Sequence, residues 1–171
     1  MHSRTTFLLL CLLLLSACSK TAQTPKTVSL QKFSPQQKDT LPPKERLFML
    51  TNKWLGTKYC YGGVSKKGVD CSALVQNLYK EAFGLKIPRT TKEQIKIGRK
   101  IEQKRLLREG DILIFKTGFR TLHSAIYLKN GEFVHASSSH GVTIANIHNP
   151  YWRNRFIEAR RLDALDLLLV Q

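Results

Sequence analysis

The spacing of the apolar residues changes once along this chain, near Gly98, and this change constrains the fold more than any other feature. Between Leu47 and Gly98, two segments have apolar residues every three or four positions, which is the period of a helix that buries one face. After it come short runs rich in β-branched and aromatic residues, separated by turn residues: GDILIF, LHSAIYL, EFVHAS, GVTIAN and RFIEARRL. Helices followed by such strands predict an α+β fold, with N-terminal helices packed on an antiparallel β-sheet.

Helices are expected at three places ahead of the sheet. The first presents one apolar face, made of Leu47, Leu50, Thr51 and Trp54. The second begins at Asp70, whose side chain can cap free backbone N–H groups, and ends at Gly84. The third and shortest begins at Thr91, because Thr91 and Gln94 have the spacing of a capping box.

The start of the chain has the order of an export signal: a basic Arg4, an apolar run over residues 7–15, and small residues ending at Cys18. The run is shorter than the roughly 20 apolar residues of a membrane-spanning helix. The tetrapeptide Leu15-Ser16-Ala17-Cys18 resembles a bacterial lipobox, in which cleavage leaves the cysteine as a lipidated first residue. An ordinary secretory signal with an incidental cysteine is the alternative. The residue after Cys18 is Ser19 rather than Asp. By analogy with enteric bacteria, this favours anchoring in the outer membrane, with the domain facing the periplasm.

The length of 171 residues allows one domain of ordinary size. We expect a lipoprotein signal peptide over residues 1–17, a flexible tether over 18–43, and one folded domain over 44–171. The formal charge of +16 would suit nucleic acid, but export removes that partner. An anionic phospholipid or a cell-wall polymer is then the natural counterpart, and simple solvated lysines explain the charge equally well. The apolar tail DALDLLLVQ is expected to pack on the domain.

Two cysteines remain as thiols after export, because Cys11 leaves with the signal and Cys18 is lipidated. Cys71 lies in the first turn of the second helix, where unsatisfied N–H groups and the helix dipole favour an anion. The thiolate is the nucleophilic form of cysteine, so Cys71 is a candidate nucleophile. Its position alone also fits a buried packing cysteine.

Two histidines bear on that choice, because His123 and His135 lie on adjacent strands joined by KNGE. A two-residue Asn-Gly turn would place the two rings on opposite faces of the sheet. A three-residue loop over 129–131, with Gly131 left-handed, pairs Ala125 with His135 and places both rings on one face. A thiol and two histidines there would supply a nucleophile, a base and an orienting group. The remaining histidines of the domain are expected in surface loops: His140 and His148.

Several segments together resemble the NlpC family of papain-like cell-wall cysteine peptidases, particularly its small Gram-negative lipoproteins: GTKYCYGG, GVDCSALV, IPRTT, REGDILIFKTG, HSAIYL, EFVHASSSHGV and PYWRNRFIEARRL. The resemblance covers about residues 46–162. It implies a papain-like fold with Cys71 as nucleophile, His123 as base and His135 as the residue that orients the base. It also implies that Tyr59 and the Cys71 N–H bind the oxyanion, and that Asp70 meets a substrate amine. Helix capping explains Asp70 equally well.

If Tyr59 points into the site, the period of two in an extended segment turns Cys60 to the opposite face. A disulfide also needs suitably directed Cβ vectors, so we do not expect Cys60 and Cys71 to form one. Cys60 is expected instead to pack as a small hydrophobe.

The resemblance also shows departures from the family pattern. Ala73 follows DCS where the family has Gly, and the strand that the family writes HVGIY carries Ser124 and Ala125. Each change adds one small group that we expect near the cleft, where it would narrow the cleft or alter substrate choice.

These observations together predict a lipid-anchored peptidoglycan hydrolase that cuts amide bonds in stem peptides or crosslinks through a Cys-His-His thioester mechanism. We expect a monomer with no cofactor and no metal, whose partners are peptidoglycan and the membrane rather than nucleic acid. Two alternatives stay open: a non-catalytic murein-binding lipoprotein, and an acyltransferase or amidase on the same scaffold.

Overall fold

The computed structural model describes residues 41–163, in which helices precede an antiparallel sheet of six strands in the order β3-β8-β4-β5-β6-β7. The strands are β3 (Arg99–Ile101), β4 (Ile112–Lys116), β5 (Leu122–Tyr127), β6 (Glu132–Ser137), β7 (Gly141–Asn146) and β8 (Phe156–Arg161). The predicted α+β class and the strand runs from β4 to β8 are confirmed. The signal peptide, nearly all of the tether and all but the first residue of the apolar tail lie outside the described residues.

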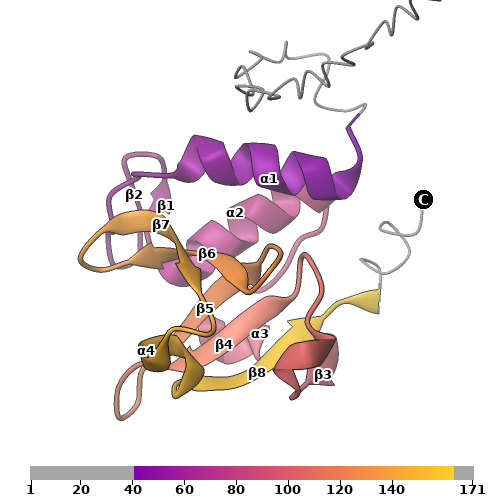
Figure 1. The fold of residues 1–171 in the computed structure, drawn as a ribbon. Coiled ribbons are helices and arrows are strands. Elements are labelled where there is room, and N and C mark those ends of the chain that lie inside the picture. The colour runs from indigo at the N-terminus through magenta and orange to yellow at the C-terminus, as the bar shows by residue number, and fades with distance from the viewer. Residues whose placement is uncertain (1–40, 164–171) are drawn as a thin grey trace, which may run out of the picture. The chain divides into compact units, whose positions relative to one another are not determined.

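The two long helices stack on one side of this sheet (Figure 1). Helix α1 (Pro43–Trp54) buries the four residues of its predicted face. Helix α2 (Cys71–Phe83) begins with Asp70 as its N-cap and ends at Gly84, whose φ of 69° is the left-handed conformation that glycine adopts readily. Helix α1 packs on α2, and α2 packs on β5 and β6. No helix within residues 41–163 is long and apolar enough to cross a membrane.

The N-cap of the third helix, α3 (Thr91–Gln94), lies one residue before the predicted position. Its N-cap is Thr90, and Glu93 completes the capping box by accepting hydrogen bonds from the Thr90 N–H and hydroxyl. The prediction of a box from Thr91 to Gln94 was therefore wrong. Both of those side chains are buried and make contacts inside the domain instead.

Both faces of the sheet are covered, and strand alternation assigns residues to one face or the other. Ile112, Ile114 and Ile126 belong to the core beneath α1 and α2. Leu113, Phe115 and Ala125 belong to a second cluster on the opposite face. The short helix α4 (Pro150–Arg153) supplies Trp152, which packs against this second cluster.

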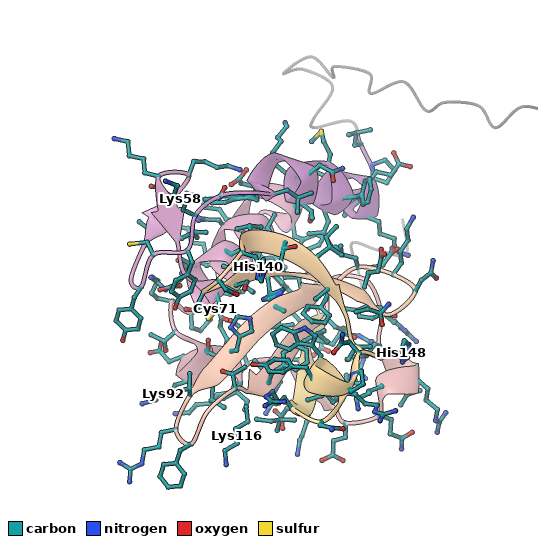
Figure 2. The ribbon with its side chains drawn as sticks, turned by 60° about the vertical axis from the view of Figure 1, so that its left-hand side comes forward. Lys58, Cys71, Lys92, Lys116, His140 and His148 are labelled. Carbon is teal, nitrogen blue, oxygen red and sulfur yellow. The ribbon has the colours of Figure 1, made fainter. Side chains whose placement is uncertain are left out.

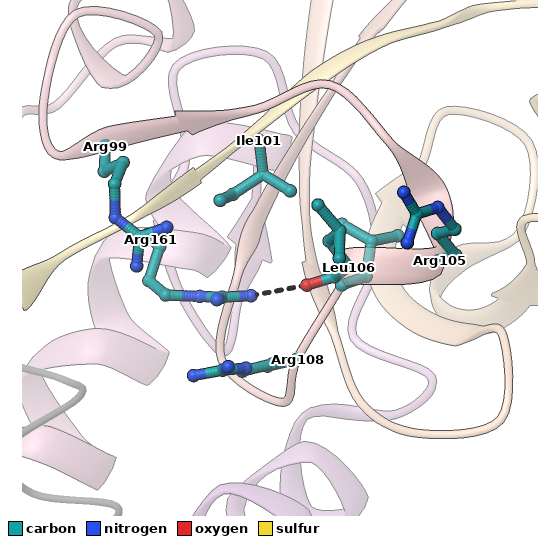
Figure 3. Close-up of a pocket in the computed structure, with 7 residues that line it drawn as sticks. Arg99, Ile101, Arg105, Leu106, Arg108 and Arg161 are labelled. Carbon is teal, nitrogen blue, oxygen red and sulfur yellow. Dashed lines mark hydrogen bonds between the residues drawn. The ribbon is translucent and has the colours of Figure 1, made fainter.

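Two buried polar contacts fix the segment that leads into β4. Arg161, in β8, donates from Nε and Nη2 to the Asp111 carboxylate, at 2.7 Å each. Its Nη2 also donates to the carbonyl of Leu106 at 2.8 Å, and Figure 3 shows this bond. From the helix side, the Tyr79 hydroxyl donates to the carbonyl of Gly110. The start of β4 is thus tied both to β8 and to α2.

Candidate active site

The start of α2 is held in place by a short backbone ladder. Tyr59 pairs with Val69 in a parallel bridge, and the Cys60 N–H donates to the Val69 carbonyl at 3.1 Å. Val69 also belongs to the hairpin of β1 (Val64–Ser65) and β2 (Gly68–Val69). Because Val69 lies two residues before Cys71, this ladder brings Tyr59 close to Cys71. Figure 2 shows Cys71 where α2 meets the sheet.

Asp70 is the most heavily hydrogen-bonded side chain at this helix start. Its carboxylate accepts from the Ala73 N–H at 2.8 Å, which confirms the capping explanation, and from the Gly62 N–H at 3.1 Å. Arg89 adds a bidentate pair at 3.0 and 2.7 Å. Burial alone would raise the pKa of Asp70, but the hydrogen bonds from Arg89 and Ala73 outweigh it, so the pKa lies below its usual value. Asp70 is therefore a carboxylate that Arg89 already engages.

The β5–β6 hairpin has the three-residue loop that places both histidines on one face. Tyr127 pairs with Phe133, the Leu128 N–H donates to the Glu132 carbonyl, and Gly131 is left-handed with φ 83°. As a result His123 Nε2 lies 3.0 Å from His135 Nδ1. The prediction of a histidine pair is confirmed.

The histidine pair lies against Trp152, which the sequence analysis did not single out. The Trp152 ring stacks on His123, with centroids 5.6 Å apart, and meets His135 edge to face at 4.8 Å. Burial, and next the neighbouring His135, lower the pKa of His123 to about 3. Burial, and next His140, lower the pKa of His135 to about 4. Both rings are therefore neutral at neutral pH.

Either ring can donate in this contact, because the roles depend on which nitrogen carries the proton. If His123 carries its proton on Nε2 and donates to His135 Nδ1, its Nδ1 keeps a lone pair for the thiol proton. His135 then acts as the acceptor that orients the base. This division of roles is the arrangement of a nucleophile, a base and an orienting group.

Tyr59 stays protonated and can donate a hydrogen bond. Burial first, and then the negative charge of the Cys71 thiolate, raise the pKa of the Tyr59 hydroxyl. Its proximity to Cys71 agrees with the predicted place beside the nucleophile.

The thiol and the histidine pair come together through packing of α2 on β5 rather than through a direct bond. The Cys71 sulfur lies 3.8 Å from Thr91 Oγ1, and within residues 41–163 it makes no hydrogen bond to either histidine ring. Catalytic hydrogen bonds are commonly long before substrate binds and tighten in the reacting complex. Cys71 and the histidine pair thus lie on packed elements, α2 and β5, without a direct hydrogen bond between them in the described residues.

Comparison with known proteins identifies the family. Residues 56–161 match the model of the NlpC/P60 family. The chain belongs to the NlpC/P60 family. Its fold is papain-like, and the family is one of cysteine peptidases.

Individual relatives support the assignment. The murein DD-endopeptidase MepS/murein LD-carboxypeptidase of Escherichia coli K12 is 44% identical over 119 residues, which cover 70% of this chain and 63% of that protein. The probable endopeptidase NlpC of the same strain is 38% identical over 91% of this chain and 97% of its own length. An NlpC/P60 family protein from Bacillus cereus, of known crystal structure, has a TM-score of 0.63 and 29% identity, covering 69% of this chain and 39% of that chain.

The second cysteine of the domain behaves only partly as expected. Cys60 and Cys71 are both free, so the prediction that they form no disulfide is confirmed. The prediction that Cys60 packs as a small hydrophobe was wrong, because its side chain is exposed. Its Cβ lies over Gly63 and Gly68 of the β1–β2 hairpin, and glycines carry no side chain that could cover it.

The three departures from the NlpC pattern do not line an open cleft. Ala73, Ser124 and Ala125 are 1%, 0% and 0% exposed. The expectation that they narrow the cleft was therefore wrong, since each side chain is enclosed by the protein. Ala73, in the first turn of α2, belongs to the main core, and Ala125 belongs to the second core cluster. Only Ser124 brings a polar group toward the site.

The prediction that two further histidines lie at the surface is confirmed. Both His140 and His148 are exposed, and His148 lies well away from Cys71 in Figure 2. The residues that the sequence analysis missed are Arg89, Thr91 and Trp152. All three stand in segments that carry the family resemblance, and their roles come from contacts across the fold rather than from local spacing.

The histidine pair should make the domain sensitive to acid. The unfolded chain takes up a proton at each histidine below about pH 6.5, whereas the native rings resist protonation down to about 4 and 3. The contribution of the two neutral rings to the free energy of unfolding is therefore complete above pH 6.5. It falls as the pH drops, by roughly 2 kcal/mol for each histidine between pH 7 and 5. Urea unfolding at the two pH values measures this loss.

The matched variants isolate that contribution. His135→Gln should remove about half of the pH dependence, whereas His148→Gln, at an exposed position, should keep it. An unchanged difference between pH 7 and 5 in His135→Gln would contradict the assignment of acid sensitivity to the buried pair.

Proposed function

We propose that this protein is a lipid-anchored peptidoglycan hydrolase that cleaves amide bonds in murein stem peptides or crosslinks. The observation that carries the proposal is the placement of Cys71 at the start of α2, packed on the strand that holds His123 in its 3.0 Å contact with His135. The printed name of the E. coli relative, a murein endopeptidase and carboxypeptidase, supports the substrate class. Because the chain covers only 63% of that relative, the activity is proposed for this chain on its own site.

The acylation step uses the tautomers of the histidine pair. His123 Nδ1 takes the thiol proton of Cys71, and the thiolate attacks the carbonyl carbon of the amide. The imidazolium that forms donates from Nε2 to His135 Nδ1 and from Nδ1 to the nitrogen of the leaving amine. The amine departs with that proton and leaves a thioester on Cys71.

The oxyanion is stabilised at the same helix start. The Cys71 N–H is one of the unpaired donors of the first turn of α2, and the protonated hydroxyl of Tyr59 is the second donor. Together they supply a few kcal/mol of barrier lowering. Water then attacks the thioester with His123 Nδ1 as base, which releases the peptide carboxylate and restores the thiol.

The anchor belongs to this proposal because the lipobox lies outside the described residues. Cys18 would carry the acyl chains, and several chains make membrane attachment durable. Ser19 supports the outer membrane, with the domain on its periplasmic face within reach of the murein.

Replacing Cys18 should test the anchor independently of catalysis. Cys18→Ala should release the protein from the membrane fraction or block its processing, because no thiol remains for lipidation. Fractionation and the mass of the N-terminal peptide measure the outcome. Unchanged fractionation, together with an unlipidated N-terminus in the wild type, would rule the lipobox out.

The hydrolase proposal is tested by digesting purified murein with the protein and identifying the released peptides by mass. New peptides with a free carboxyl at a stem-peptide bond are expected, and their masses identify the bond. Murein that binds the protein but yields no peptide would favour the non-catalytic alternative.

A further inference from the structure

We propose that Thr91 and Ser124 form a hydroxyl relay that stabilises the Cys71 thiolate, with Ser124 as a positioning residue that acts through Thr91. The relay deepens the proposed function, since it assumes Cys71 as the nucleophile. The Cys71 sulfur lies 3.8 Å from Thr91 Oγ1, which lies 3.1 Å from Ser124 Oγ. These three atoms come from α2, α3 and β5, so the packing of these elements brings them together.

The relay is shielded from bulk water. Thr91 is 7% exposed and Ser124 is 0% exposed. A hydrogen bond to an ionised acceptor is stronger than one between neutral groups, and a dry surrounding strengthens it further. A hydroxyl that points at the sulfur from this side therefore favours the thiolate over the thiol.

Contacts around α3 hold Thr91 in place. The capping box of Thr90 and Glu93 fixes the helix start. The Gln94 amide donates to the carbonyls of Ser72 and Pro88, at 3.0 and 2.9 Å, which ties α3 to the first turn of α2. Thr91 Oγ1 thus keeps its position relative to the nucleophile.

The direction of the hydrogen bonds reverses with the charge on sulfur. When Cys71 is a thiol, S–H can donate to Thr91 and Thr91 to Ser124. When Cys71 is a thiolate, Ser124 donates to Thr91 Oγ1, which turns the Thr91 proton toward the sulfur. Each hydroxyl keeps its own proton, and the thiol proton goes to His123. The relay stabilises the thiolate twice, before attack and again when the thioester is hydrolysed.

Ser124 has a specific part because Thr91 alone could direct its proton elsewhere. A donor at Ser124 occupies a lone pair of Thr91 Oγ1 and leaves the sulfur as the acceptor for the Thr91 proton. The family pattern HVGIY has an apolar Val at this position, so Ser124→Val removes the hydroxyl while keeping a side chain of the kind that this strand accepts.

The test measures the rate at which iodoacetamide alkylates Cys71 as a function of pH, in the full chain and without substrate. Peptide mass mapping follows Cys71 and the exposed Cys60 in one reaction, so Cys60 is an internal reference. Thr91→Val should shift the midpoint of the Cys71 profile upward and slow its alkylation at pH 6 by about tenfold. Ser124→Val should give a smaller shift of the same sign.

Thr91→Ser is the matched control, because it keeps the hydroxyl and should keep the wild-type profile. The Cys60 profile should not move in any variant. If Thr91→Val folds poorly, Ser124→Val and Ser124→Ala carry the test. Profiles of Thr91→Val and Ser124→Val that superimpose on the wild type would overturn the relay. A shifted profile in a protein that releases no peptide from murein would leave the relay standing and refute the proposed hydrolase.

Discussion

Replacing Cys71 by Ala should reduce the release of murein peptides by several powers of ten, at least about a thousandfold. No other nucleophile takes over, because covalent attack requires the sulfur at the start of α2 and the oxyanion donors around it. The fold should survive, since the side chain becomes smaller by one atom at a partly exposed position. Peptide release from purified murein, measured against the same amount of wild-type protein, gives the ratio.

Cys60→Ala is the matched control for that experiment. It makes the same substitution in the same domain, at a cysteine whose thiol is exposed. The Cys60 backbone N–H, which holds this segment to Val69, is unchanged by the substitution. Its activity should equal that of the wild type. Wild-type product from Cys71→Ala, or equal losses in both variants, would refute Cys71 as the nucleophile.

The second large effect is expected at the histidine pair. His123→Ala should lower the rate by about a hundred- to ten-thousandfold, because it removes the group that takes the thiol proton and returns it to the leaving amine. His135→Gln should cost much less, about tenfold, because the amide oxygen can still accept from His123 Nε2. Rates of peptide release in the two variants measure the difference.

His148→Gln provides the control for a histidine outside the site. A larger loss in His135→Gln than in His123→Ala would reverse the roles assigned to the two rings. Equal losses in all three variants would point to a general effect on folding instead.

The parts of the fold that were predictable are those set by local spacing. The face of α1 and the cap of α2 follow from the periods of a helix and from the hydrogen-bonding capacity of Asp70. The strands from β4 to β8 follow from β-branched runs between turn residues. By contrast, β1, β2 and β3 have only two or three residues each and show no readable period.

The N-cap of α3 was misplaced for a physical reason. Thr90 with Glu93 and Thr91 with Gln94 have the same spacing, so both pairs fit a capping box. Burial decides between them: Thr91 turns inward to Cys71 and Ser124, which leaves Thr90 at the surface to cap the helix. Local spacing carries no information about that choice.

The pairing of the two histidines was predictable, and the contacts that support the candidate site were not. The cysteine, the base and the orienting histidine stand in short segments with a strong resemblance, and the length of one hairpin loop decided their alignment. The pairing of Arg89 with Asp70 joins residues 19 positions apart, and Trp152 reaches His123 from a helix beyond two further strands. Such contacts depend on the packed fold, so only the structure shows them.

The most direct test of the account is digestion of purified murein in water enriched in ¹⁸O, followed by mass analysis of the released peptides. Hydrolysis of a Cys71 thioester by water predicts one ¹⁸O atom in the new carboxyl group of each product, and no such product from Cys71→Ala. Products without the label would show transfer to an amine rather than to water, and the absence of any new peptide would show that the protein does not cut murein. Either result would contradict the hydrolase.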